Sequence, residues 1–113
     1  MPHTIIETKF NNEESIGFVI KSPPDSNAFK RGTSLIREAL DSGAAVYVYL
    51  LDAAVEDLRG NSFESLQKLG AKVCVCALAL DKRGIECPDS MIPSGLTMMS
   101  DIMLHSNRMF LFN

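Results

Sequence analysis

Short apolar runs separated by polar segments are the most regular feature of the chain. Four of these runs predict strands, at residues 16–20, 44–51, 73–76 and 108–112. Each run is apolar almost throughout, which is typical of strands covered on both faces of a parallel sheet.

The segments between these runs favour helices. Apolar positions recur at helical spacing over residues 28–42 and about 94–106, and shorter helices are predicted at about 61–69 and 77–83. Strands that alternate with helices need crossover connections between parallel strands. The pattern therefore predicts an α/β fold, a three-layer sandwich around a mostly parallel sheet of four to five strands.

Several helix ends can be predicted from local chemistry. Two prolines delay the first helix until after Pro24, so Asp25 or Ser26 is expected to cap it. Asn61 with Glu64 three residues later resembles a capping box. Gly84 predicts a left-handed ending for the helix at 77–83, and residues 87–95 read as an irregular link.

The length and composition indicate one domain. The chain has 113 residues, of which 46% are hydrophobic and 22% charged. Residues 15–113 are predicted to form a single α/β domain, and residues 1–14 an N-terminal arm or an edge strand.

Net charge and cysteine content limit the classes of partner and the cellular compartment that the sequence suggests. The net charge of −3 and the lack of a Lys/Arg cluster argue against nucleic acid as a partner. No apolar stretch approaches the roughly 20 residues that span a bilayer, so no membrane partner is expected. Three cysteines without disulfide-framework spacing favour a reducing compartment, and the predicted location is the cytoplasm.

Cys76 is the candidate reactive residue because it lies where a strand passes into a helix. Unpaired backbone N–H groups and the helix dipole favour an anion there, and thiols at helix N-termini react as nucleophiles. The alternative is a buried free cysteine that packs as a small hydrophobe. That interpretation fits Cys74 better, since Cys74 lies deeper in the same strand.

Other candidate residues follow from the expected sheet. Ligands of open α/β sheets gather beyond the carboxyl ends of the strands. Ser22 and Asp25 follow the first strand, and Asp52 follows the second. Asp52 either orients a donor or serves as a turn residue. Arg83 either assists the thiolate of Cys76 or complements the end of its helix.

Residues 73–85 resemble the DsrE/DsrF family of small sulfur-relay proteins, in the version carried by DsrE and TusD. The resemblance lies in the Val-Cys-Val-Cys strand at 73–76, the Lys-Arg-Gly-Ile segment at 82–85, and the placement of Cys76 eight positions before Gly84. It extends more weakly to residues 22–25, 50–52 and the closing helix and strand, over about 16–112.

The resemblance implies an α/β fold, homo-oligomers such as trimers or hexamers or mixed complexes, and a sulfurtransferase-like persulfide carrier. Cys76 would take sulfane sulfur from a donor protein and pass it to an acceptor protein, with no cofactor. Two departures from the family pattern are Ala53, where a glycine is common, and the additional Cys74 and Cys87. Some family subunits lack the cysteine, so the alternative is a non-catalytic scaffold or a small-ligand binding subunit.

Two further site classes are compatible with some of these residues. A metal site from Cys74, Cys76, Cys87 and His105 matches no strong zinc spacing, so no metal is expected. A flavin or phosphate site before the helix at 28–42 lacks a glycine-rich cradle, and the prolines remove two backbone donors. The methionines of the last helix are most simply core residues; because Met98 and Met99 lie on different sides of it, the alternative is a subunit contact on one side.

Overall fold

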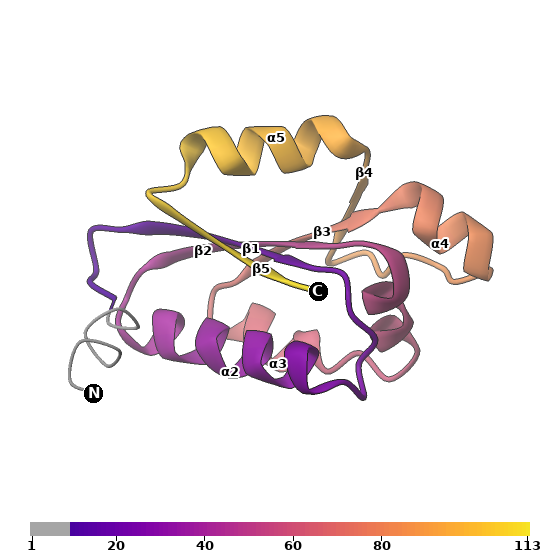
Figure 1. Cartoon of the computed structure of the whole chain (residues 1–113), viewed down its shortest axis with the longest axis horizontal. Helices are drawn as coiled ribbons and strands as arrows, with labels where there is room; N and C mark the ends of the chain where they lie inside the picture. Colours follow the sequence, from indigo (N-terminus) through magenta and orange to yellow (C-terminus); the bar gives the residue numbers. More distant parts are fainter. Residues whose placement is uncertain (1–9) are drawn as a thin grey trace.

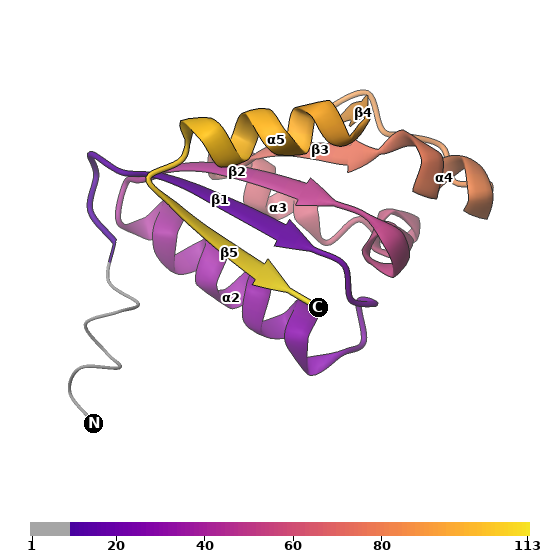
Figure 2. The ribbon, with the colours of Figure 1, turned by 45° about the horizontal axis from the view of Figure 1, so that its top comes forward.

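The computed structural model describes residues 10–113 and has one five-stranded sheet in which all paired strands run parallel. The strand order is β4-β3-β2-β1-β5 (Figures 1 and 2). The strands are β1 (Ser15–Ile20), β2 (Ala45–Leu50), β3 (Lys72–Cys76), β4 (Ile92–Ser94) and β5 (Arg108–Phe112). The predicted α/β class and parallel sheet are therefore confirmed.

Helices cover both faces of this sheet. Helices α2 and α3 lie on one face and α5 on the other, while α4 extends beyond the carboxyl end of β3 (Figures 1 and 2). The bounds are α2 (Asn27–Asp41), the 3-10 helix η1 (Asp52–Arg59), α3 (Phe63–Lys68), α4 (Ala77–Arg83) and α5 (Leu96–His105). The three predicted layers are present. Within residues 10–113, none of the helices has the length and apolar character needed to cross a bilayer.

The side chains of each central strand point alternately into two apolar cores. Phe18, Val48 and Val75 belong to the core beneath α2 and α3. Tyr49 and Cys74 belong to a smaller core beneath α5. Because successive side chains of a strand point to opposite faces, covering both faces requires the continuous apolar runs seen in the sequence.

Two predicted helix ends are confirmed. The Ser26 side chain accepts a hydrogen bond from the backbone N–H of Phe29 and caps α2. Gly84 adopts a left-handed conformation with φ 62°, and the backbone N–H of Ile85 donates to the Leu80 carbonyl at 3.0 Å. This is the Schellman ending, in which a residue without Cβ reverses the chain at little cost.

The predicted capping box was wrong. Asn61 has φ 52°, and its buried Oδ1 has no hydrogen-bond partner within the described part of the chain. Instead the Asp57 carboxylate accepts hydrogen bonds from the backbone N–H and the hydroxyl of Ser62, which precedes α3. The Asp57 carboxylate of the preceding η1 thus accepts hydrogen bonds at the start of α3.

The irregular link predicted at 87–95 was wrong in its last part. Strand β4 forms there and pairs with β3, so that Cys76 lies opposite Ser94 in the register. The strand contains Pro93, which cannot donate to a ladder and is tolerated only because β4 is an edge strand.

The predicted N-terminal arm or edge strand at 1–14 lies mostly outside the described residues. Residues 10–14 form a turn, and Glu14 pairs with Arg108 through an Nε–Oε1 distance of 2.8 Å. Phe10 packs edge-on against Phe110 with a ring separation of 5.9 Å. The domain boundary at residue 15 stays a prediction.

Candidate functional site

Cys76 is the last residue of β3 and the N-cap residue of α4. Its backbone is extended, with φ −64° and ψ 114°, and Ala77 begins the helix. Its side chain is partly exposed and packs beside the core beneath α5. The predicted junction of strand and helix is therefore present, with the thiol neither sealed in the core nor fully in solvent.

Tyr49, on the neighbouring strand β2, belongs to the core cluster against which Cys76 packs. The residue is 0% exposed, and its hydroxyl donates to the Ser94 carbonyl at 3.3 Å. Burial first, and then the charge of a Cys76 thiolate and a hydrogen bond to it, raise the pKa of Tyr49 to about 12. Tyr49 therefore remains protonated at neutral pH and can donate a hydrogen bond.

Sequence reasoning missed Tyr49 because it lies inside a run that reads simply as core strand. The available signal was its spacing. In the register Tyr49 lies opposite Cys74, and Cys76 follows two positions later on the same face of β3. The strand order needed to use this signal is a property of the fold.

Cys74 lies in the core beneath α5 with 6% of its surface exposed. Burial raises the pKa of its thiol, and a hydrogen bond with Ser94 opposes this in part. A buried thiol with a raised pKa stays protonated and is a poor nucleophile.

Cys87 is partly buried in the segment before β4. Its Sγ donates to the carbonyls of Pro88 and Met91 at 3.5 and 3.7 Å. Burial raises the pKa of this thiol, and the nearby charge of Asp89 raises it further. These surroundings favour the protonated thiol.

The predicted binding residues after β1 and β2 lie at the carboxyl edge of the sheet (Figure 2). Ser22 is 7% exposed, and its Oγ has no hydrogen-bond partner in residues 10–113. Asp25 is exposed. Asp52 begins η1 with φ 51°, and its carboxylate lies 3.9 Å from the Lys21 ammonium. Asp52 thus makes the turn from β2 into η1.

Arg83 lies at the opposite end of α4 from Cys76. Its guanidinium is 3.4 Å from the Glu56 carboxylate, and its backbone carbonyl accepts a hydrogen bond from Arg59. These contacts fasten α4 to η1. They hold the Arg83 side chain at the end of α4 that is distant from Cys76.

Cys74, Cys76, Cys87 and His105 do not come together as a metal site. Within residues 10–113, no three His, Cys, Asp or Glu side chains form a group that could hold a metal ion. The Nδ1 atom of His105 lies 2.8 Å from the carbonyl of Asp101, one turn earlier in α5.

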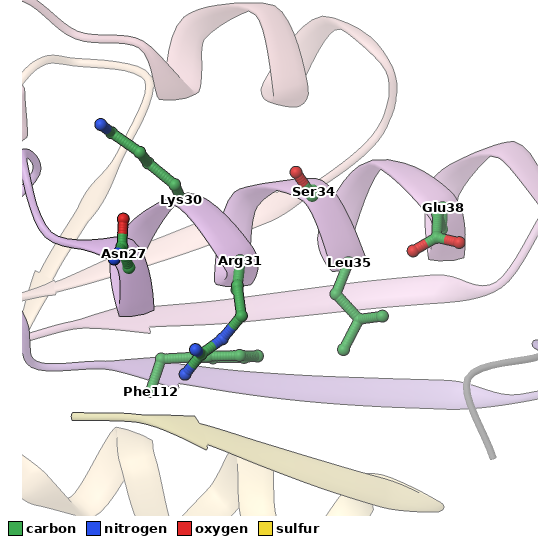
Figure 3. A pocket seen from close by; sticks show the side chains of 7 residues that line it. All are labelled: Asn27, Lys30, Arg31, Ser34, Leu35, Glu38 and Phe112. Carbon is green, nitrogen blue, oxygen red and sulfur yellow. The ribbon is translucent and has the colours of Figure 1, made fainter. Parts of the chain in front are cut away.

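A shallow cavity of about 630 Å³ lies between α2 and the end of β5 and holds none of the predicted site residues. Arg31 and Leu35 extend from α2 toward β5, where Phe112 lies (Figure 3). Lys30 and Glu38 add opposite charges to its lining. This wide, mixed surface lacks the convergent polar groups of a built binding site.

Comparison with known proteins assigns the chain to a family. The profile of the DsrE/DsrF-like family matches residues 14–112, which is nearly the whole chain. No curated protein matches the sequence. With the parallel sheet, and with Cys76 at the end of β3, the match establishes that this chain belongs to the DsrE/DsrF-like family.

Proposed function

We propose that this protein accepts sulfane sulfur as a persulfide on Cys76 and transfers it to an acceptor thiol. The DsrE/DsrF-like family is generally linked to sulfur relay. The observation that carries the proposal is the setting of Cys76, which is partly exposed at a strand–helix junction beside the Tyr49 hydroxyl. Cys74 and Cys87 lie in surroundings that favour the neutral thiol.

The chemistry is two thiol exchanges. The Cys76 thiolate attacks the outer sulfur of a donor persulfide, the donor's S–S bond breaks, and the donor leaves as a thiolate. The acceptor's thiolate then attacks the outer sulfur on Cys76, which releases Cys76 as a thiolate. No net oxidation occurs, so neither an oxidant nor a cofactor is needed. The proposed partners are a donor protein and an acceptor protein.

Intact mass spectrometry tests this proposal. The protein is incubated with a small-molecule persulfide, and the mass of one added sulfur atom is expected in the wild type. Cys87→Ser is the matched control because Cys87 is also partly buried, and it should load normally. Cys76→Ser should remain unloaded. Adding a small thiol to loaded protein should restore the original mass, which reports the transfer step.

The contrary outcomes are distinct. Sulfur that remains on Cys76→Ser would move the role to another cysteine. If the wild type takes up no sulfur, the protein is a non-catalytic scaffold or a small-ligand binding subunit of the same fold.

We also propose that the chain forms a homo-oligomer in the cytoplasm. Leu104 and Met103 of α5 are 79% and 53% exposed, and Leu111 of β5 is 63% exposed. An apolar groove of about 370 Å³, lined in part by Met103 and Leu111, lies between α5 and the β1–β5 side of the sheet. An exposed apolar surface of this kind is typical of a contact with another subunit. Light scattering after size-exclusion chromatography should give a mass above that of one chain, and Leu104→Glu should lower it.

A further inference from the structure

We infer that Tyr49 donates a hydrogen bond to the anionic sulfur of Cys76 and holds it in place during sulfur transfer. This inference rests on the proposed function and adds a residue to it. Tyr49 lies on β2, next to β3, and its side chain enters the core beneath α5 together with Cys74 and Cys76. Tyr49 and the reacting cysteine thus lie on the same face of the sheet, on neighbouring strands.

The hydroxyl carries one proton and has two acceptors. One is the Ser94 carbonyl at 3.3 Å, a separation longer than the 2.5–3.0 Å usual for O–H···O bonds. The other, in this inference, is the sulfur of Cys76, because Cys76 lies opposite Ser94 in the β3–β4 register and packs against the same cluster as Tyr49. A charged acceptor binds a donor about twice as strongly as a neutral one. When Cys76 becomes an anion, the Tyr49 hydroxyl therefore donates its hydrogen bond to the sulfur instead of to the Ser94 carbonyl.

The surroundings keep this donor available. Tyr49 is fully buried, and Met98 and Met99 of α5 pack against its cluster. The raised pKa of Tyr49 means that the hydroxyl does not lose its proton in the range where a thiol ionises.

Among the ionisable groups on the elements packed against β3, Asp81 and Lys82 of α4 are exposed to solvent, and those of β3 and η1 named next are neutral or paired. The thiol of Cys74 stays neutral because burial raises its pKa. The acidic side chains of η1 all have partners: Asp52 pairs with Lys21, Glu56 with Arg59 and Arg83, and Asp57 with Ser62. Tyr49 contributes a hydroxyl to the cluster in which Cys76 packs.

The test is the pH profile of thiol–disulfide exchange at Cys76 in Tyr49→Phe, measured with an aromatic disulfide reagent. Peptide fragmentation assigns the label to Cys76. Loss of one charge-assisted hydrogen bond should lower the thiolate-to-thiol ratio about tenfold. The remaining thiolate should be about threefold more nucleophilic, since nucleophilicity rises with basicity. The variant should react about threefold slower at low pH and about threefold faster at high pH, so the two profiles cross.

Tyr47→Phe is the matched control, because Tyr47 lies two residues earlier on the same face of β2 and contacts the same cluster. Its profile should coincide with that of the wild type. Superposed profiles for Tyr49→Phe would overturn the inference. A uniform change at every pH would also overturn it, because that indicates altered exposure of the thiol.

A second measurement leaves Tyr49 in place. The chain has two tyrosines, so Tyr47→Phe retains Tyr49 as the single tyrosine. Its near-ultraviolet absorption should shift as Cys76 ionises, and Cys76→Ser in the same background should abolish the shift. An unchanged spectrum would contradict the inference. Failure of the wild type to load sulfur would refute the proposed function alone, whereas normal loading without crossing profiles or a spectral shift would refute the role of Tyr49 alone.

Discussion

Gly17 sets how closely α5 approaches the sheet. A Cβ at this position of β1 would overlap Met109 Sδ and would lie 2.9 Å from both Ile102 Cγ2 and Ser106 Oγ. Met109 can move aside because its side chain is flexible. Ile102 is 6% exposed and belongs to the core beneath α5, and the Ser106 hydroxyl donates to the Ile102 carbonyl. The end of α5 therefore has to shift if Gly17 becomes alanine.

The expected cost can be estimated from these contacts. Overpacking of a well-packed site costs about 1–3 kcal/mol, and replacing a strand glycine by alanine recovers about 0.5–1 kcal/mol of backbone entropy. We expect Gly17→Ala to lose about 1–2 kcal/mol in free energy of unfolding, measured from the urea midpoint and slope. Because Cys74 lies in the same core as Ile102, its thiol should also react faster with a disulfide reagent.

Gly60→Ala is the matched control. A Cβ at Gly60 meets nothing within 4 Å, and its φ of −107° suits any residue. This variant should unfold at or slightly above the wild-type urea midpoint, since alanine restricts the unfolded chain. Equal midpoints for Gly17→Ala and Gly60→Ala would refute the close packing of α5 on β1.

The remaining predictions concern helix ends and one ion pair. Ser26→Ala should lower the free energy of unfolding by about 1 kcal/mol because it removes the cap of α2, while the exposed Ser34→Ala should not, as urea denaturation can show. The Arg108 side chain, and then a backbone hydrogen bond from Asn11, hold the pKa of Glu14 below its usual range. This pair therefore stabilises the fold above the pKa of an unfolded glutamate and loses its effect as the pH falls through the folded value. Glu14→Gln should be less stable than the wild type near pH 7, and the difference should vanish in acid; a difference that persists in acid would contradict it.

The parts of the fold that were predicted correctly depend on residues close in sequence. A strand buried on both faces has to be apolar at every position, so β1, β2 and β3 were visible as runs. The ending of α4 needs only Gly84 and an apolar pair five residues apart, Leu80 and Ile85. The position of Cys76 between β3 and α4 followed from these same local rules.

The parts that were missed depend on neighbours distant in sequence or in strand order. Strand β4 has three residues and includes a proline, so it exists only because β3 offers an open edge. Asp57, and not Asn61, accepts the hydrogen bonds at the start of α3, because the path of η1 brings its carboxylate to Ser62. Neither the open edge nor the path of η1 is visible as a pattern in the sequence.

The same limit explains why the site was only partly predicted. A reactive thiol can be located from its own strand, but the group that faces it comes from the next strand in the sheet, twenty-seven positions away in the case of Tyr49. Once β2 is known to pair with β3, the alternation of side chains requires Tyr49 to share a face with Cys76. A polar tip on a buried aromatic ring then needs a partner, and here the Ser94 carbonyl accepts from the hydroxyl. The chemistry of this site therefore depends on strand pairing as much as on the cysteine itself.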